Sequence, residues 1–368
     1  MTDAVELHPL DDVAALHAGD PSDMLGAVAS AGAQVRQALT TCAAVDFDVL
    51  RDSGRPRAVL VAGMGGSGIA GHVLQAAAGP ECPVPVERIR GWTLPAWVGP
   101  DDLVIAVSSS GRTAETAACT TEALSRGSRL VVVAADESPL VDQAVSAGVP
   151  WVPVPTGRPP RANLWALSVP LLVVADAVGI VDAPSAELAA VADLLDGVAG
   201  RCAPAVPVAQ NPAKQLAVEL VGTLPMIWGT SDLAGIAAYR LMCQLAENAK
   251  YPAVNGVLPE ALHNQVVTFD GRWVGVEAAS PLRLVMLRDT VEHSNVTTSV
   301  SAAGDLAQNV GVGVSTVMAV GRHPLHRMAS LVAVGDFASV YLGLLQQLDP
   351  TPIGPIEALK ARLAQRVR

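Results

Sequence analysis

The sequence predicts an α/β protein built from two doubly wound domains, each with a parallel sheet that helices cover on both faces. Its 368 residues exceed one typical domain and suffice for two domains that each bury a core. Short continuous runs of Val, Leu and Ile alternate with Ala-rich stretches of helical spacing, which is the order of βαβ units. Apolar residues make up 51% of the chain but aromatic residues only 3%, so Ala, Val and Leu are expected to fill the cores.

The first domain is expected at residues 51–200, after an N-terminal helical segment at residues 1–50. Its predicted strands are continuous apolar runs, which are typical of parallel strands buried on both faces. They lie at residues 58–62, 103–107, 129–135 and 149–154, and helices are predicted between them at 69–78, 114–125 and 139–147. The apolar stretch Leu164–Ile180 contains Pro170 and Asp176 and falls short of the roughly 20 uninterrupted residues of a membrane helix, so it predicts a buried helix.

The second domain is expected at residues 213–350, after a linker at residues 201–212. An amphipathic helix pattern precedes this linker within the segment 181–212, which ends in prolines. Strands are predicted at 224–229, 272–278, 282–288 and 314–320, the short run 265–269 is also strand-like, and helices are predicted at 233–250 and 324–347. The last segment, residues 351–368, ends in a basic turn that favours a helix C-terminus.

Charge and cysteine content narrow the possible partners and the compartment. A net charge of -11 argues against nucleic-acid binding, which normally requires a dense Lys and Arg surface. The five cysteines are odd in number and widely spaced, which fits a reducing compartment better than a disulfide framework or a metal site. The first residues carry acids where a secretory signal carries bases and an apolar run. We therefore expect a cytoplasmic protein without nucleic-acid or membrane partners.

A glycine-rich loop, Gly63–Gly68, follows the first predicted strand and precedes a helix. Backbone N–H groups and the positive end of that helix would meet an anion there. The same glycines also satisfy the G-x-G-x-x-G fingerprint of dinucleotide-binding domains, with the acidic Glu87 at roughly the expected distance. This loop alone therefore leaves a phosphate site and a dinucleotide site as alternatives.

A second loop, Ser108–Thr113, follows the strand at 103–107 and also opens a helix. Its cluster of hydroxyl groups suits a phosphomonoester, although Ser and Thr at a helix start are also ordinary caps. Two such loops on neighbouring parallel strands favour a ligand that lies across the carboxyl ends of the sheet.

Together these motifs resemble the sugar isomerase (SIS) domain proteins, and among them the bifunctional phosphoglucose/phosphomannose isomerases. The run GMGGSGIAG at 63–71 is similar to the first loop of that family, and SSSGRTAET at 108–116 to its Ser-rich phosphate loop. Further similar motifs, in the family's order and spacing, are PPRANL at 159–164, QLAENAKYPA at 244–253, LPEALHNQ at 258–265 and DPTPIGPIEALK at 349–360.

The resemblance implies two SIS domains, a homodimer with shared active sites, and a sugar phosphate as the small-molecule substrate. The implied reaction interconverts glucose 6-phosphate or mannose 6-phosphate with fructose 6-phosphate by ring opening and proton transfer through an enediol, without a cofactor. The substrate phosphate would be bound at the two loops by the following residues: Gly66, Ser67, Ser108, Ser110 and Thr113.

The resemblance also assigns catalytic roles to four residues. Glu247 would be the general base that moves the proton between C2 and C1. His263 would assist ring opening, for which an imidazole is suited near neutral pH, and Lys360 would help it. Arg161 would stabilise the enediolate charge. Without the resemblance, Glu247 followed by Lys250 would indicate a solvated ion pair, and His263 an ordinary loop residue.

Three positions depart from the family pattern, and two other functions stay open. Ser109 and Arg112 replace Tyr and Asn of the phosphate loop, and Gln265 replaces a frequent Glu. A non-catalytic sugar-phosphate sensor or scaffold is the main alternative, and a nicotinamide dehydrogenase is disfavoured by the second loop. No metal is required, and His323 and His326, although spaced for one helical face, are not expected to bind one.

Overall fold

The apolar runs of the first half form a parallel sheet in a computed structural model that describes residues 8–274 and 280–366. In the described chain this sheet has the order β2-β1-β3-β4-β5, with all neighbours parallel. Its strands are β1 Val59–Ala62, β2 Val86–Ile89, β3 Leu103–Ser108, β4 Arg129–Ala135 and β5 Trp151–Val154. The central strands β1 and β3 are fully buried, as the continuous apolar runs predict. Strand β2 was not predicted, because its VERI sequence is an edge strand with only Val86 buried.

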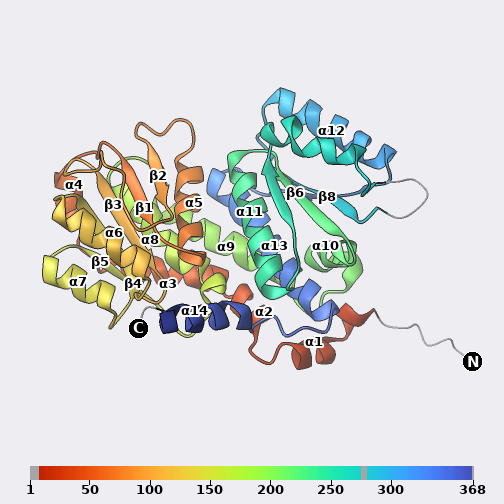
Figure 1. Ribbon diagram of the computed structural model, residues 1–368, viewed down its shortest axis with the longest axis horizontal. Helices are drawn as coiled ribbons and strands as arrows, with labels where there is room; N and C mark the ends of the chain where they lie inside the picture. Colours follow the sequence, from red (N-terminus) through yellow and green to blue (C-terminus); the bar gives the residue numbers. More distant parts are fainter. Residues whose placement is uncertain (1–7, 275–279, 367–368) are drawn as a thin grey trace, which may run out of the picture.

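The second half forms a second parallel sheet with the corresponding order, β7-β6-β8-β9. Its strands are β6 Leu224–Gly229, β7 Val254–Val257, β8 Leu282–Arg288 and β9 Gly313–Met318. Figure 1 shows the two sheets in separate halves of the molecule, with helices of both halves between them.

Two strand predictions in the second half need correction. The run 265–269 is a 3-10 helix, Gln265–Asp270, in which Val267 is 69% exposed. Strand β7 is already hydrogen-bonded to β6 at this edge of the sheet, so residues 265–269 do not form a strand there. In the run 272–278, Arg272 and Trp273 lie in a turn and Val274 has no regular structure, while residues 275–278 lie outside the described residues.

The helices cover both faces of each sheet. The helices predicted at 69–78, 114–125, 139–147, 233–250 and 324–347 all form within about three residues of the predicted bounds, whereas the helices at 212–220 and 294–309 were not predicted. In the first half the helices are α1 Val13–Gly19, α2 Met24–Ala29, α3 Ala31–Ala43, α4 Asp48–Asp52, α5 Gly66–Ala78, α6 Ala114–Ser125, α7 Pro139–Ala147 and α8 Leu164–Ala177. Helix α9 Ser185–Arg201 follows, and in the second half the helices are α10 Pro212–Leu220, α11 Asp232–Asn248, α12 Ser294–Asn309, α13 Pro324–Leu345 and α14 Gly354–Arg366.

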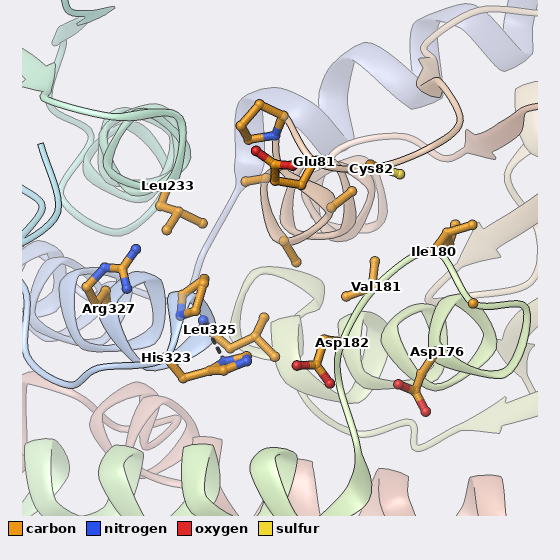
Figure 2. A pocket seen from close by; sticks show the side chains of 17 residues that line it. Glu81, Cys82, Asp176, Ile180, Val181, Asp182, Leu233, His323, Leu325 and Arg327 are labelled. Carbon is orange, nitrogen blue, oxygen red and sulfur yellow. Dashed lines mark hydrogen bonds between the residues drawn. The ribbon is translucent and has the colours of Figure 1, made fainter. Parts of the chain in front are cut away.

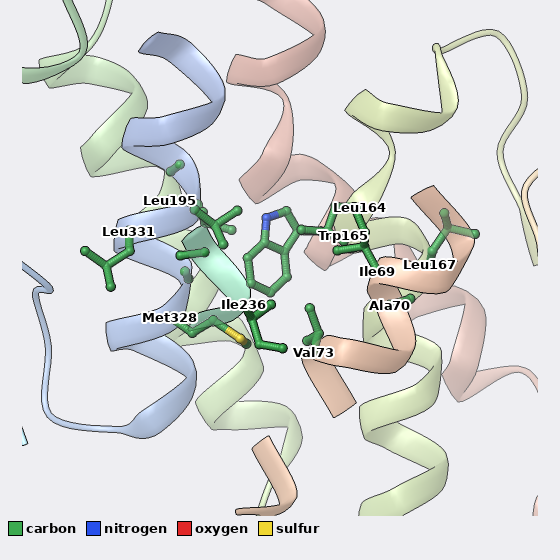
Figure 3. Packing of buried hydrophobic residues seen from close by; sticks show 14 of the residues in the cluster. Ile69, Ala70, Val73, Leu164, Trp165, Leu167, Leu195, Ile236, Met328 and Leu331 are labelled. Atoms are coloured by element: carbon green, nitrogen blue, oxygen red, sulfur yellow. The ribbon is translucent and has the colours of Figure 1, made fainter. Parts of the chain in front are cut away.

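One large apolar core is shared by the two halves. Trp165 of α8 lies among Val73 of α5, Ile236 of α11 and Met328 of α13 (Figure 3). Two smaller cores lie on the outer faces, one under α6 and α7 and one under α12. The amphipathic pattern within 181–212 forms α9, which buries Leu195 in the shared core. Because fully buried side chains of this size contribute about 1.5–3 kcal/mol each, this layer joins the halves firmly.

Two apolar helices belong to this core. Helix α8 is the buried helix predicted at 164–180, with Pro170 inside it. Helix α13 is long and apolar enough to cross a membrane by length and composition, but 89% of its most apolar window is buried inside the fold. Helix α14, in contrast, runs along the outside of the molecule (Figure 1), and its Ile356, Leu359 and Leu363 are exposed.

Candidate active site

The two predicted phosphate loops lie next to each other at the carboxyl ends of β1 and β3. These strands are neighbours, with Ala62 paired to Ala106, and the chain leaves them in opposite directions. Helix α5 packs into the shared core, whereas α6 packs into the core on the other face of the sheet. This arrangement is a topological switch point, where open parallel sheets bind their ligands.

The first loop depends on glycine at two places. Gly65 has φ +55°, a backbone conformation that a side chain disfavours. Gly66 lies against the turn before α8, and a Cβ at this position would lie only 2.9 Å from the carbonyl oxygen of Pro160. No side chain caps the first turn of α5, so its N-terminal amides keep the anion-binding character that the sequence predicts. Gly66 therefore places this loop directly beside Pro160 and Arg161.

The second loop is tied to the first by its own hydrogen bonds. The backbone N–H of Ser109 donates to Ser67 Oγ at 3.0 Å, and the hydroxyls of Ser108 and Thr113 are 2.9 Å apart. Thr113 precedes α6, but its hydroxyl does not cap the helix. The capping alternative is therefore wrong for Thr113, whose hydroxyl belongs to the loop cluster. Ser110 is exposed, and its Oγ accepts a bond from the N–H of Arg112 at 3.3 Å.

Arg161 and Glu247 come together beside this pair of loops. Arg161 Nη1 lies 3.7 Å from Glu247 Oε2, with the Arg161 side chain 3% exposed and the Glu247 side chain 33% exposed. Burial lowers the pKa of Arg161, which nonetheless stays charged near neutral pH because an arginine begins far above it. The site therefore holds a partly solvated carboxylate next to a buried positive charge.

The other nitrogens of Arg161 are fully engaged, which fixes its orientation. Nε donates to Asn248 Oδ1 at 2.6 Å, and Nη2 donates to the carbonyl oxygens of Pro350 and Thr351, each at 2.8 Å. Asn248 is itself held by Ser339 Oγ at 2.9 Å. Only Nη1 points toward the carboxylate, so this nitrogen is the one that can meet a substrate.

A buried ion pair behind Arg161 holds its backbone. Arg240 makes a bidentate pair with Asp336, with both N–O distances 2.7 Å, and also donates to the carbonyl oxygen of Arg161 at 2.8 Å. Gln244 donates to the Asp336 carboxylate at 3.1 Å. No role was predicted for these residues from the sequence, although Gln244 and Asn248 both lie in the motif QLAENAKYPA.

Lys250 ties the end of α11 to the segment that precedes α14. Its Nζ donates to the carbonyl oxygens of Glu247, Asp349 and Pro350 at 2.8, 3.3 and 3.2 Å. It makes no ion pair with the Glu247 carboxylate, so the solvated pair weighed from the sequence is wrong. Burial, and next the charge of Arg161, lower the pKa of Lys250.

A cleft of about 470 Å³ opens beside Glu247, and its walls come from the end of α11 and the start of α14. Lys250 and Tyr251 form one side, and Ile353 and Ile356 form the other. The cleft therefore has apolar walls with the carboxylate of Glu247 at its edge.

His263 and Lys360 do not join this group within one chain. His263 ends the short 3-10 helix Glu260–His263 after β7, and its side chain is exposed. Lys360 is exposed on α14. Within the described residues, neither side chain makes a hydrogen bond or ion pair with Arg161 or Glu247. Gln265 is structural here, because it accepts a bond from Trp228 Nε1 at 2.7 Å and donates to the carbonyl oxygen of Asn255.

At the carboxyl ends of the strands of the second sheet, the protein's own charged side chains occupy the place that corresponds to the two loops of the first sheet. Glu292, which follows β8, accepts bonds from Arg288 at 2.6 and 3.1 Å, from Thr230 at 2.6 Å and from Thr297 at 3.1 Å. Burial raises the pKa of Glu292, but the bonds from Arg288 and Thr230 outweigh it and hold that pKa below its usual range.

Asp289 closes the same end of the sheet from its other side. It accepts a bond from Arg327 at 2.6 Å and one from Ser231 Oγ at 2.8 Å. Ser231 also caps α11 by accepting a bond from the Ala234 N–H at 3.2 Å. His293 caps α12 in the same way, so both helix starts at this end are occupied.

A separate cavity of about 760 Å³ lies between the halves and contains none of the predicted site residues. Figure 2 shows its lining: Glu81 and Cys82 after α5, Asp182 after α8, and His323 and Arg327 at the start of α13. His326 Nε2 lies 3.1 Å and His323 Nδ1 3.7 Å from the Glu187 carboxylate. Among the residues that the structure describes, no three or more His, Cys, Asp or Glu side chains lie together as a metal site would require.

The chain is similar to known proteins over most of its length. Residues 209–363 match the family model described as bacterial phospho-glucose isomerase C-terminal SIS domain. The chain is 33% identical over 311 residues to a protein of Caldicellulosiruptor bescii named bifunctional phosphoglucose/phosphomannose isomerase, covering 83% of this chain and 89% of that protein. A protein of the same name from Aquifex aeolicus is 28% identical over 317 residues, covering 86% and 93%.

Solved structures share the fold. A hypothetical protein from Thermus thermophilus superposes with a TM-score of 0.73 at 17% identity, covering 98% of this chain and 94% of that one. This similarity extends the match to both halves of the molecule. With the identity and coverage of the curated relatives, the chain belongs to the bifunctional phosphoglucose/phosphomannose isomerase family of SIS-domain proteins.

Proposed function

We propose that this protein is an aldose–ketose isomerase that interconverts glucose 6-phosphate and mannose 6-phosphate with fructose 6-phosphate. The observation that carries the proposal is the pair Arg161 and Glu247, 3.7 Å apart, next to the phosphate loop, since the backbone of Pro160 and Arg161 packs against Gly66. A sugar phosphate held by the loop would have its carbon chain beside a base and a positive charge. A sensor or scaffold has no need of this pair, so that alternative is not favoured.

The phosphate group is assigned to the two loops at the switch point. The hydroxyls of Ser108 and Thr113 are hydrogen-bonded to each other, the Ser67 hydroxyl is bound to the backbone N–H of Ser109, and Ser110 is exposed in the same loop. The uncapped amides at the start of α5, at Gly66, add donors and the positive end of a helix dipole. Such an array suits a dianion, because a phosphomonoester accepts several hydrogen bonds at once.

Proton transfer is assigned to Glu247, and charge stabilisation to Arg161. The base removes the proton from C2 of the open-chain aldose and returns it to C1, while negative charge develops on the enediolate oxygen. Arg161 Nη1 is held for that charge by three bonds to its other nitrogens. Glucose and mannose 6-phosphate differ only at C2 and share one product, so one base serves both substrates.

His263 and Lys360 are assigned to ring opening, within a homodimer that shares its active sites. His263 is exposed and lies on a different element from the cleft at Glu247, so it is free to meet a site on a second copy. The exposed apolar side chains of α14, Ile356, Leu359 and Leu363, are also suited to a contact between copies. In a two-fold dimer the same surface of both copies forms the contact, so each of these residues occurs at the contact twice.

We also propose the remaining organisation that the sequence predicts. The first SIS domain spans residues 51–200, the second spans 213–350, and the helix with Lys360 follows at 351–368. The protein is proposed to be cytoplasmic and to work without a cofactor, a metal ion, nucleic acid or a membrane.

A coupled assay tests the reaction. Fructose 6-phosphate formation is followed from glucose 6-phosphate and, separately, from mannose 6-phosphate, with purified full-length protein. Turnover of both is expected. Activity on one sugar alone would remove the bifunctional assignment, and no turnover of either would remove the isomerase.

Mixing two inactive variants tests the shared site. Glu247→Gln and His263→Asn chains are unfolded together and refolded as a mixture. Random assortment is expected to restore about one quarter of the wild-type activity, because half of the dimers then carry one intact site. Recovery no greater than the sum of the two variants refolded alone would place both residues in one chain's site.

A further inference from the structure

A basic cleft lies between the two halves, apart from the site described above. Its volume is about 490 Å³, and α5 and β2 form one wall while α11 and β7 form the other. The cationic and aromatic residues in its lining are His72, Arg88, Arg90 and Tyr239. None of these residues has a role in the proposed isomerase reaction.

Arg88 is held in a fixed orientation within this basic cleft. Its Nε donates to Gln75 Oε1 at 2.8 Å, and the Gln75 amide is oriented by a second bond, from Nε2 to the carbonyl oxygen of Val86 at 3.0 Å. Its Nη1 contacts His72 Nε2. Because an arginine only donates hydrogen bonds, this contact requires the unprotonated nitrogen of a neutral imidazole.

His72 is well suited to stay neutral. Burial, and next the charges of Arg88 and Arg90, lower its pKa to about 4. Its ring stacks on Tyr239 of α11, with ring centres 4.7 Å apart and planes at 9°. The imidazole therefore orients Arg88 without adding or cancelling charge, and it links the two walls of the cleft.

Both arginines lack an acidic partner. Arg88 is half-buried and Arg90 is exposed, and neither forms an ion pair with any residue that the structure describes. The carboxylate in the cleft lining, Asp232, forms none with them either. By contrast, the buried arginines elsewhere do pair: Arg161 with Glu247, and Arg240 with Asp336. Two guanidinium groups without an ion-pair partner thus line one cleft, and their like charges repel each other unless an anion binds between them.

We propose that the basic cleft binds a phosphate dianion, either inorganic phosphate or the phosphate group of a small metabolite, between Arg88 and Arg90. Planar guanidinium groups match phosphate oxygens with paired hydrogen bonds, and two of them balance a charge of about two. The Tyr239 hydroxyl adds a further donor. The ligand bridges the two domains and contacts the second half of α5 and the first half of α11, helices whose opposite ends carry Gly66 and Glu247.

Calorimetric titration of the full-length protein with sodium phosphate at low ionic strength tests the proposal. The reference is the double variant Ser67→Ala/Thr113→Ala, which weakens the substrate loops. About one equivalent of phosphate is expected to bind to it, and Arg90→Ala in that background is expected to weaken binding at least about tenfold. Arg55→Ala is the matched control, because Arg55 is an exposed arginine of the same domain outside the cleft.

The outcomes separate this proposal from the isomerase. If the isomerase assignment is wrong and the substrate loops bind no phosphate, the wild-type protein will still bind one equivalent of phosphate, and this binding will depend on Arg90. Equal phosphate affinity in the Arg90→Ala and Arg55→Ala variants, or no binding to the double variant, would overturn the proposal. If Arg90→Ala instead dissociates a dimer with no change in phosphate binding, the arginines hold a carboxylate of a second copy, and the proposal is wrong.

Two further arms complete the test. Titration with glycerol 3-phosphate identifies the source of the phosphate group: tighter binding than inorganic phosphate indicates an ester, and weaker binding indicates the free ion. Arg90→Lys keeps the charge but loses the planar fork, so an intermediate affinity is expected, with the fold checked by circular dichroism.

Discussion

In the described chain the second sheet repeats the order of four of the first sheet's five strands, but the two sheets have opposite contents at their carboxyl ends. The first sheet presents glycines and hydroxyls there, and no side chain caps the first turn of α5 or α6. The second sheet presents Asp289 and Glu292, which are neutralised by arginines, and its helices α11 and α12 are capped by Ser231 and His293. One end is open to an anion, and the other is occupied by the protein's own carboxylates.

This difference shows that the fold supplies a place for a site, whereas the loops decide whether it is used. In the second domain the carboxylates of Asp289 and Glu292 repel an anionic ligand. They also bind the arginine and hydroxyl groups that would otherwise hold that ligand. Its contribution to the active site is indirect, since α11 follows β6 of that domain and carries Glu247 to the open end of the first sheet. Variants at matched positions of the two ends can break or sharpen this contrast.

The largest expected effect is on the base. Glu247→Gln should lower kcat about 10³-fold, because the amide cannot accept the substrate proton. The matched change in the second domain, Glu292→Gln, should leave kcat within about threefold, since that carboxylate lies at the closed end. Steady-state kinetics with both hexose phosphates measure the two values. Comparable losses in both variants would contradict an open and a closed end.

Loss of loop hydroxyls comes next. Ser67→Ala and Thr113→Val should each raise KM about tenfold to 100-fold, because each removes a hydrogen bond to a charged group. Ser231→Ala in the second domain should leave KM unchanged and lower the free energy of unfolding by about 1 kcal/mol, the usual value of a lost N-cap. A rise in KM for Ser231→Ala would show that the second loop also meets the substrate.

A smaller effect is expected from the support of Arg161. Asn248→Ala removes the acceptor of Nε, so kcat should fall about tenfold while KM changes little, because the phosphate loops stay intact. It should also lower the free energy of unfolding by about 2 kcal/mol, since a buried donor loses its partner. Ser339→Ala, which removes only the bond behind Asn248, should give a weaker change in the same direction. A pure stability loss with unchanged kcat would make Asn248 merely structural.

The smallest effect is the acid dependence of the closed end. Glu292 has a pKa below that of an unfolded glutamate, so its stabilisation is present above about pH 4.3 and is lost as the pH falls through the folded value. Urea unfolding at pH 6 should show Glu292→Gln less stable than wild type by about 1 kcal/mol, with the difference shrinking as the pH falls below about 4.3. The exposed Glu81→Gln serves as control, and a gap independent of pH would contradict an ionised Glu292.

The sequence predicted the central strands and most helices because these segments are uniformly apolar or have helical spacing. It missed β2 and β7, which are short edge strands with polar residues. It wrongly predicted a strand at 265–269, where two valines and a phenylalanine form part of a 3-10 helix in which only the phenylalanine is buried. Local patterns do not show which edge of a sheet is already paired.

The candidate site divides in the same way. The two loops could be predicted from short local motifs, and they lie where expected, at the switch point where two neighbouring strands end. The pair Arg161 and Glu247 came from the family resemblance, and the structure brings these residues together. The support by Arg240, Asp336 and Asn248 was missed, because it depends on contacts between helices far apart in the chain. His263 and Lys360 keep their predicted roles as proposals.

The apolar layer shared by the two sheets limits how this protein can be divided. If the chain were cut between the two sheets, Trp165 would lie in one fragment and Ile236 and Met328 in the other (Figure 3). Each fragment alone would then expose to water the apolar surface that it buries against the other. Neither fragment is therefore expected to remain dispersed when produced alone. Co-production of both fragments would be needed to recover the fold, although the chain has two separate sheets.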